Sequence, residues 1–255
     1  MTMKLTNLLN EEYANTKNQI VSDLHIHENT AFFQEIFLSR SVLGADEISE
    51  IKCDKMYQNL FNKTPWTPED IFLLSDKIKE EEQAFYFYDF GMILSRLINT
   101  HHLITENKNY LLKTEHLEKK LPNLCYRNNG ANITIYGSVG NGCCKQMYDG
   151  IVRILGNCGS LCESMTDGSV SVEGNCNWNV GTDMKNGIVT ITGNVANEIG
   201  TNMRGGEIII EGHAFTVGNR MKGGIIRING NIELSVGWRA SYGEIYNKDK
   251  RVYPK

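Results

Sequence analysis

The second half of the sequence repeats one phrase every 18 or 19 residues. IGTNMRGGEIIIEG at 199–212 is followed by VGNRMKGGIIRING at 217–230, with aliphatic, methionine, basic and glycine positions in the same order. Six I-x-I-x-G phrases keep this period, and they end at Gly137, Gly156, Gly174, Gly193, Gly212 and Gly230. Such a period predicts a repeat architecture in which each unit buries its apolar face by stacking on its neighbours.

Each repeat contains one short run with strand alternation, such as Ile208 and Ile210, followed by further apolar residues such as Val217 and Met221. We therefore predict a parallel β-helix of about six coils over residues 131–245, with equivalent residues stacked about 4.8 Å apart. A left-handed hexapeptide β-helix would place aliphatic residues every six positions. These residues do not follow that spacing, which excludes the hexapeptide architecture.

Two columns of turn residues recur at the same period. We expect corner glycines at positive φ, at Gly181, Gly200, Gly218 and Gly237. Asparagines follow the strand glycine, and we expect them to adopt left-handed backbone conformations and to hydrogen-bond from coil to coil, at Asn157, Asn175, Asn194 and Asn231. His213 interrupts the asparagine column and is interpreted as a turn residue.

The first half of the chain has a different composition. Of the 24 glycines, only Gly44 and Gly91 precede residue 125. In TPEDIFLLSDKIKEEEQ at 67–83, Thr67 is a good N-cap and Pro68 suits the first helical position. We predict an α-helical domain over 1–125. It is followed by the β-helix domain over 126–255, whose C-terminal tail at 246–255 caps the last coil.

The net charge of −4 and a pI near 5.9 argue against a nucleic-acid or anionic-membrane binder. No apolar run approaches the roughly 20 residues that span a bilayer, and the N-terminal residues lack the apolar core of a signal peptide. A cytoplasmic location is therefore predicted. The seven cysteines are expected to be free, buried thiols in a reducing compartment.

The phrase at 180–193, 199–212 and 217–230 resembles the glycine-motif repeat domain at the C-terminus of the glutamate synthase large subunit. It is also similar to the repeat-bearing polypeptide of formylmethanofuran dehydrogenase. The resemblance covers residues 130–245 approximately. It implies a right-handed β-helix without active-site residues, which serves as a spacer or scaffold that holds catalytic domains apart.

A basic residue follows the repeat methionine in three successive coils, at Lys185, Arg204 and Lys222. Like charges stacked at coil spacing repel one another unless they are solvated or face an anionic partner. The column is interpreted either as a solvated edge or as a contact surface for an acidic protein.

The segment SDLHIHEN at 22–29 contains Asp23, His25 and His27 in an Asp-x-His-x-His pattern. It is similar to the metal-binding opening of amidohydrolases and of the polymerase-histidinol-phosphatase family. Histidines at i and i+2 on a strand share one face and can both bind zinc. The competing interpretation makes them surface or capping residues.

Four cysteines form stacked pairs in the predicted register, with Cys144 over Cys162 and Cys158 over Cys176. Cys144 and Cys162 stand where later coils have a corner glycine. A metal or iron–sulfur site requires three or four converging thiolates, which stacked pairs do not obviously supply. We therefore expect a ladder of small buried side chains, and no cofactor.

The sequence favours a protein that is not an enzyme. The leading hypothesis is a non-catalytic scaffold or protein-interaction module built on a glutamate-synthase-type β-helix, with protein partners and neither nucleic acid nor membrane contacts. A homo-oligomer formed through the faces or ends of the β-helix is compatible with this hypothesis. One alternative is an accessory subunit of a glutamate-synthase-like or formylmethanofuran-dehydrogenase-like complex. A second alternative is a metal-dependent hydrolase that uses Asp23, His25 and His27.

Overall fold

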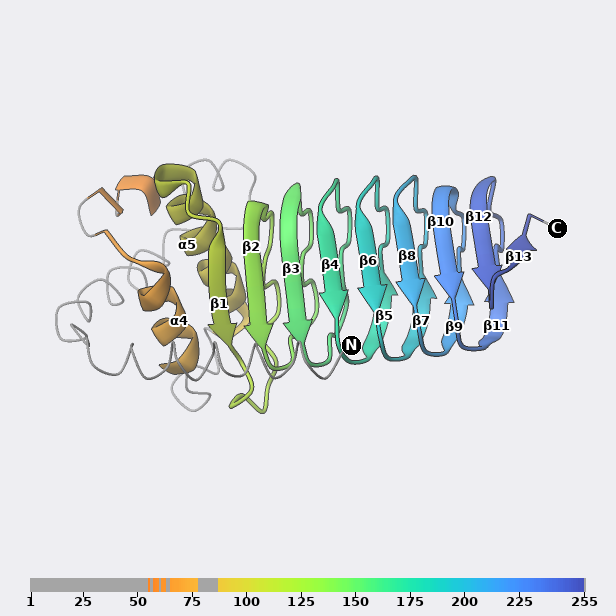
Figure 1. Cartoon of the computed structure of the whole chain (residues 1–255), viewed down its shortest axis with the longest axis horizontal. Helices are drawn as coiled ribbons and strands as arrows, with labels where there is room; N and C mark the ends of the chain where they lie inside the picture. The colour runs from red at the N-terminus through yellow and green to blue at the C-terminus, as the bar shows by residue number, and fades with distance from the viewer. Residues whose placement is uncertain (1–54, 56, 60, 63–64, 78–86, 255) are drawn as a thin grey trace. The chain divides into compact units, whose positions relative to one another are not determined.

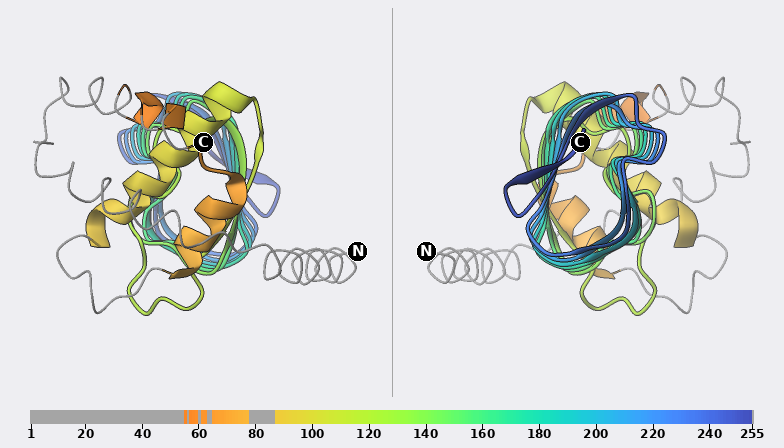
Figure 2. Two further views of the ribbon diagram at one scale, coloured as in Figure 1. Left: turned by 90° about the vertical axis from the view of Figure 1, so that its left-hand side faces the viewer. Right: turned by 90° about the vertical axis from the view of Figure 1, so that its right-hand side faces the viewer.

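The structure is a computed structural model that describes residues 55, 57–59, 61–62, 65–77 and 87–254. The chain divides into two compact units, Met1–Pro65 and Trp66–Lys255. The second unit is a parallel β-solenoid of about seven turns that begins with two helices. Its coils stand side by side in chain order (Figure 1) and superimpose as one closed loop when they are viewed along the solenoid axis (Figure 2).

The two helices are α4 (Pro68–Lys77) and α5 (Phe87–Thr105). Thr67 caps α4 as predicted: its Oγ1 accepts a hydrogen bond from the Asp70 N–H at 3.2 Å, and the Asp70 carboxylate accepts one from the Thr67 N–H at 2.8 Å. Both helices pack against the first strands of the solenoid. The Asn99 side-chain amide of α5, for example, donates to the Tyr126 carbonyl at 3.3 Å. The helices thus cover the first coil.

One wall of the solenoid is a sheet of nine strands. All neighbours in it are parallel except the last pair. In spatial order the strands are β1 (Asn109–Lys113), β2 (Asn129–Tyr136), β3 (Asp149–Leu155), β4 (Ser169–Val172), β6 (Ile188–Ile191), β8 (Glu207–Ile210), β10 (Lys222–Ile228), β12 (Tyr242–Asn247) and β13 (Lys250–Tyr253). Equivalent residues of successive coils are paired, as the repeat predicts.

The second wall is a parallel sheet of four strands. Its spatial order is β11 (Ile232–Val236), β9 (Ala214–Val217), β7 (Val195–Ile199) and β5 (Cys176–Val180). Earlier coils contribute isolated parallel bridges here, such as Cys143 with Leu161 and Cys158 with Cys176. The coils that contain β2 and β3 therefore contribute to this wall less regularly than the later coils do.

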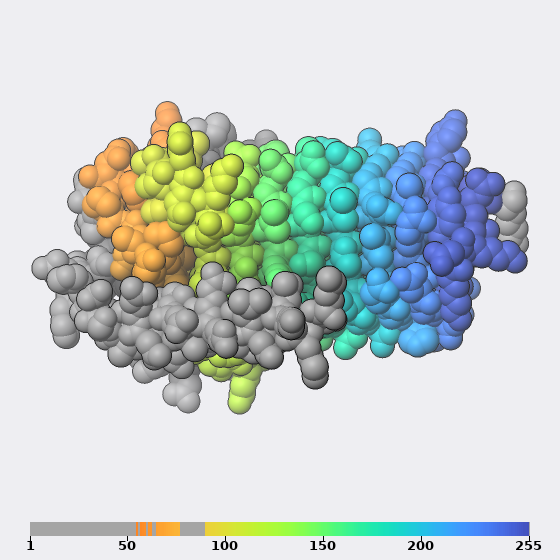
Figure 3. All heavy atoms as spheres, viewed as in Figure 1, coloured from red at the N-terminus to blue at the C-terminus, as the bar shows by residue number. Residues whose placement is uncertain are grey.

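The core of the solenoid is a bore filled by columns of equivalent side chains. Alternate residues of the parallel strands in the first wall point inward and are buried, as Ile208 and Ile210 illustrate, whereas β12 buries only Ile245 and β13 none. The repeat methionines also fill the bore with no exposed surface, at Met147, Met165, Met184, Met203 and Met221. Successive colour bands in Figure 3 show that each coil contacts chiefly the coils beside it.

The solenoid begins earlier in the chain than its glycine phrases indicate. The sequence prediction places residues 109–113 in the helical half, but they form β1, which pairs with β2 from Asn109 with Asn132 to Lys113 with Tyr136. The prediction of about six coils is therefore corrected to about seven turns. The segment NYLLK escapes the repeat pattern because it alternates for only five residues and lacks the terminal glycine.

The corner glycines have the predicted positive φ, between 63° and 72° at Gly181, Gly200, Gly218 and Gly237. The asparagine column does not, because none of its four members has a positive φ. Its side chains instead form a ladder, in which a side-chain acceptor on one coil receives the backbone N–H of the equivalent residue on the next coil. This ladder runs through Ser138, Asn157, Asn175, Asn194, His213 and Asn231. His213 is a member of the ladder and accepts through Nδ1 at 3.1 Å.

The last coil is closed by the C-terminal residues. Strand β13 folds back and pairs antiparallel with β12. The ring of Tyr253 lies where a side chain on Gly237 would begin, and its hydroxyl donates to the Ala240 carbonyl at 2.9 Å. Among the described residues, neither α4 nor α5 nor any other helix has the length and apolar character of a membrane span.

Candidate functional site

Three thiols meet inside the first coils of the solenoid. Cys125 lies in the turn before β2, and Cys143 and Cys144 lie in the connection between β2 and β3. Their sulfur atoms all lie within 4.8 Å of one another, and the Sγ atoms of Cys143 and Cys144 are 3.8 Å apart. All three side chains are buried. We refer to Cys125, Cys143 and Cys144 as the thiol cluster.

The corner position of the repeat brings two members of the cluster into one column. The Cys144 N–H donates to Leu124, the Cys162 N–H to Cys143, and the Gly181 N–H to Leu161, so Cys125, Cys144, Cys162 and Gly181 are equivalent residues in successive coils. The three corner cysteines keep the left-handed conformation, with φ of 60°, 55° and 59° in chain order. A left-handed non-glycine residue costs roughly 1–2 kcal/mol, so glycine would be the less strained choice.

The thiol cluster continues into neighbouring thiols. Cys162 follows Cys144 in the corner column, and Cys158 neighbours Cys143 and forms a parallel bridge with Cys176. Hydrogen bonds from the Cys125, Cys144 and Cys158 thiols lower the pKa of Cys143 well below its usual value. Burial raises the pKa of Cys144 and of Cys162.

The sequence predicts part of this arrangement. The pairs Cys144 with Cys162 and Cys158 with Cys176 are buried in adjacent coils as expected, and all six described cysteines are free. The expectation that three thiols do not converge is wrong. Cys125 stands 19 residues before Cys144 and continues the same column, but it coincides with the predicted domain boundary. Cys143 occupies the position of an apolar filler in the repeat, which hides its part in the cluster.

Where a cysteine replaces glycine at a corner, a smaller residue replaces isoleucine on the strand that faces it. A Cβ atom added to Gly181 would lie 2.5 Å from Ile208 Cδ1, and one added to Gly218 would lie 2.5 Å from Ile245 Cδ1. The strand residue at the position of Ile208 is valine in the three preceding coils, at Val189, Val170 and Val152. These three valines correspond to the corners at Cys162, Cys144 and Cys125. A glycine corner is thus matched with isoleucine on the strand, and a cysteine corner is matched with valine.

The basic column predicted at Lys185, Arg204 and Lys222 is exposed and stacked. Each backbone N–H donates to the carbonyl of the repeat methionine one coil earlier, at Met165, Met184 and Met203 respectively. None of the three makes a salt bridge within the part of the chain that the structure describes. Their stacking is therefore an observation, whereas their role in partner binding stays a prediction.

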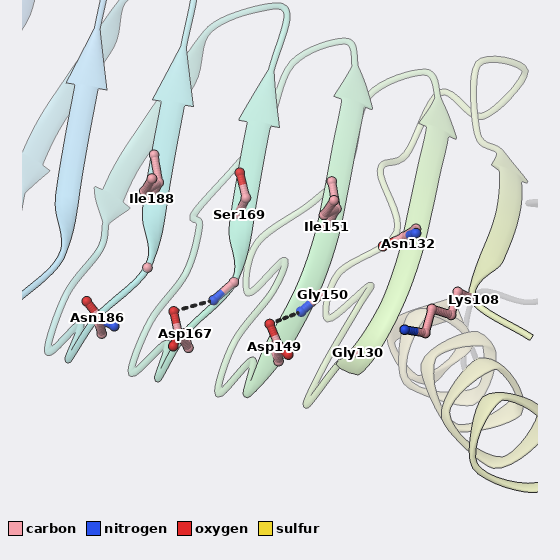
Figure 4. Close-up of a pocket in the computed structure, with 12 residues that line it drawn as sticks. Lys108, Gly130, Asn132, Asp149, Gly150, Ile151, Asp167, Ser169, Asn186 and Ile188 are labelled. Carbon is pink, nitrogen blue, oxygen red and sulfur yellow. Dashed lines mark hydrogen bonds between the residues drawn. The ribbon is translucent and has the colours of Figure 1, made fainter. Parts of the chain in front are cut away.

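An open groove of about 570 Å³ runs along the beginnings of β2, β3, β4 and β6. Figure 4 shows Asp149, Asp167 and Asn186 in a row along it, with Lys108 at one end. The Asp149 and Asp167 carboxylates accept hydrogen bonds from the N–H groups of the glycines that follow them, at 2.7 and 2.8 Å. These carboxylates therefore stabilise the turns that begin the strands.

The C-terminal end of the four-stranded wall has an open strand edge. Strand β11 is the terminal strand, and no strand in the described ranges pairs with its outer edge. Large apolar side chains are exposed nearby: Leu234 on β11 is 72% exposed, Trp238 51% and Tyr242 74%. The guanidinium groups of Arg220 and Arg239 lie 5.7 and 4.4 Å from the Trp238 ring centroid. We refer to β11 with Trp238 and Tyr242 as the open edge.

Asp23, His25 and His27 lie outside the described residues, so the structure does not test the predicted hydrolase site. Two other histidines that the structure describes have structural contacts. His101 Nδ1 lies 2.8 Å from the Tyr110 hydroxyl, and His102 Nδ1 lies 2.7 Å from the Asn107 carbonyl.

No protein-family model matches this chain, and neither a curated protein nor a solved structure does. The resemblance of its repeat to the glutamate synthase and formylmethanofuran dehydrogenase domains therefore remains a prediction from the repeat phrase.

Proposed function

We propose that this chain is a non-catalytic scaffold built on a right-handed solenoid, and that a partner protein docks at the open edge. The observation that carries the proposal is the unpaired outer edge of β11 among the described strands, with Leu234 exposed on it. A strand at the edge of a sheet presents unpaired N–H and C=O groups that can pair with another extended segment. The matching end of the nine-stranded wall, by contrast, is paired with β13.

The open edge favours an extended partner segment with apolar side chains at alternate positions. Main-chain pairing gives such complexes their affinity, and side-chain contacts give them specificity. Leu234 and Trp238 supply apolar surface close to the unpaired backbone. Aromatic residues and arginines are enriched at interface centres, and Trp238 lies between Arg220 and Arg239.

The contents of the bore support a reducing cytoplasmic location. All six described cysteines are free although several lie close together, and disulfides are rare in reducing compartments. The catalytic component of an enzyme complex is the kind of partner that the repeat resemblance favours. In that form of the proposal, the chain serves as an accessory subunit of a glutamate-synthase-like or formylmethanofuran-dehydrogenase-like complex.

The proposal is tested by site-specific photo-crosslinking in cells that produce the full chain. A photoreactive amino acid replaces Leu234 in one version and Ile188 in another. Ile188 is a matched control because it is also an exposed aliphatic residue, 46% exposed, but lies on β6 inside the nine-stranded wall. We expect position 234 to form a crosslink with one extended peptide of another protein, and position 188 to form none.

A Leu234→Lys substitution should abolish co-purification of the crosslinked protein, because a charged edge residue opposes strand pairing. Ile188→Lys should leave co-purification unchanged. Equal crosslinking at positions 234 and 188 would show that the open edge is not a docking site. A crosslink between two copies of this chain would replace the proposed hetero-complex with self-assembly.

A further inference from the structure

The thiol cluster has a composition that the packing of the bore does not require. At the corners Gly181, Gly200 and Gly218, the same bore is closed by glycine with isoleucine, as Gly181 with Ile208 shows. The first coils use cysteine with valine and accept left-handed cysteines at Cys125 and Cys144. Because both combinations fill the bore, the chemistry of sulfur is the property that distinguishes the first coils from the rest.

We propose that Cys125, Cys143 and Cys144 bind one thiophilic d¹⁰ metal ion, Zn²⁺ or Cu⁺, inside the first coils of the solenoid. Soft thiolate ligands select these ions over the harder divalent cations. Two sulfurs bound to one zinc ion at about 2.3 Å in tetrahedral geometry lie about 3.8 Å apart. The Cys143 and Cys144 sulfurs are 3.8 Å apart, and Cys125 completes a trio within 4.8 Å.

Three thiols and one neighbouring thiol decide the coordination that the site offers. The trio alone supplies three sulfurs. Cys162, the next buried residue of the corner column after Cys144, is the candidate for the fourth sulfur that a structural zinc site requires. Each thiol that binds the ion forms one sulfur–metal bond and releases one proton to the solvent, so binding weakens as the pH falls.

The position of the cluster defines what the bound ion does. Cys125 belongs to one coil, and Cys143 and Cys144 belong to the next. An ion held by all three links two successive coils close to the helices that cover the solenoid. Because the three side chains are buried, the ion enters while the chain folds, and metal binding contributes to folding free energy.

The test uses the full-length chain, refolded without oxygen and with a thiol reductant in the presence of Zn²⁺ or of Cu⁺. After removal of loosely bound ions, the metal content per chain is measured by mass spectrometry. We expect about one tightly held ion per chain. A zinc chelator added to one portion and a Cu⁺ chelator added to another identify which of the two ions the site retains more tightly.

The decisive variant is Cys144→Gly combined with Val170→Ile, because later coils use that pairing of side chains. It removes one ligand while it keeps the bore filled. We expect more than a tenfold loss of retained metal, with wild-type far-ultraviolet circular dichroism. The matched control is Cys176→Val, which removes a buried thiol outside the cluster and reproduces Val195 of the same column. This control should retain the ion.

Two results would overturn the proposal. One is a wild-type chain that holds no more metal than the Cys144→Gly/Val170→Ile variant; the other is an equal loss in Cys176→Val. If the double variant does not fold, Co²⁺ replaces zinc in the refolded wild-type chain. Thiolate-to-cobalt charge-transfer absorption supports the site, and its absence together with no retained Cu⁺ shows that the thiols serve only as packing.

Discussion

Gly181 and Ile208 occupy one compartment of the bore, because the Ile208 Cδ1 atom lies 2.5 Å from the place where a side chain on Gly181 would begin. Gly181 is also left-handed, with φ of 67°. The same relationship holds at Gly218 with Ile245. A residue at a corner therefore determines which aliphatic side chain fits on the second strand of the nine-stranded wall that follows it.

Gly181→Ala should destabilise the solenoid by about 3 kcal/mol. The estimate combines roughly 1–2 kcal/mol for a left-handed alanine with about 1–3 kcal/mol for overpacking. Adding Ile208→Val should recover the overpacking part, because it removes the methyl group that meets the new Cβ. Urea denaturation of both variants and of Ile208→Val alone measures the effect. Equal losses in the single and double variants would contradict the shared compartment.

The reverse exchange should be nearly neutral one coil closer to the N-terminus. Cys162→Gly alone leaves a void and should cost about 1–2 kcal/mol, and Val189→Ile alone should overpack the bore by a similar amount. In the metal-free protein, the double variant Cys162→Gly/Val189→Ile should have a free energy of unfolding within about 1 kcal/mol of wild type, because the two changes compensate. A double-mutant cycle measured by urea denaturation gives the coupling energy between positions 162 and 189. A coupling energy of zero, which means that the two losses simply add, would contradict the prediction.

Asn175 should stabilise the junction between two coils through its side-chain oxygen. That oxygen accepts the Asn194 N–H at 2.7 Å, and Asn175→Ala should cost about 1 kcal/mol because the N–H loses its protein partner. Hydrogen exchange of the Asn194 amide should become faster. Asn177→Ala is the control: it removes an exposed asparagine from the same coil but outside the ladder. Unchanged exchange at Asn194 in Asn175→Ala would rule out the ladder bond.

Stability should fall in mild acid because of His101. Burial lowers the pKa of His101, and the charges of Glu69 and Asp70 oppose that shift only in part. The unfolded chain, with a histidine pKa near 6.5, then binds the proton more readily than the folded chain. The free energy of unfolding is therefore constant above about pH 6.5 and decreases below it, until His101 is protonated in the folded state.

His101→Gln should remove this part of the pH dependence. The check is urea denaturation of wild type and variant above and below the ordinary histidine pKa of about 6.5. His116→Gln serves as the control, because His116 is exposed, and it should keep the wild-type dependence. If the free energy of unfolding of His101→Gln falls with pH as steeply as that of the wild type, the acid sensitivity comes from other groups.

The fold is predictable where several residue types recur in the sequence at the same period. Ile208, Met203 and Gly200 each recur at the same period, and together they require stacked coils. Strand β1 is not predictable in the same way, since NYLLK alternates without a glycine and sits among helical patterns. Asn157 is correctly predicted to belong to a hydrogen-bonded column, but its predicted backbone conformation is wrong. A short polar side chain suits either a left-handed turn or a ladder, and the composition does not distinguish them.

The thiol cluster is less predictable than the fold. Stacking relates residues one period apart, and this relation places Cys144 above Cys162. The contact between Cys143 and the corner column depends on how the chain turns within one coil, which a linear repeat does not encode. Cys125 has a sequence signal, its 19-residue spacing from Cys144. This spacing can be interpreted as part of the corner column only when the solenoid is known to begin before the glycine-rich half.

The ladder from Ser138 to Asn231 gives the molecule a direction of growth. Each side-chain acceptor stands ready on one coil, and its donor is a backbone group of the coil that is synthesised next. A chain that leaves the ribosome N-terminus first can therefore add coils one at a time, each on a finished template. The β13 strand folds back onto β12 after the last of these coils, and it ends the growth of the nine-stranded wall.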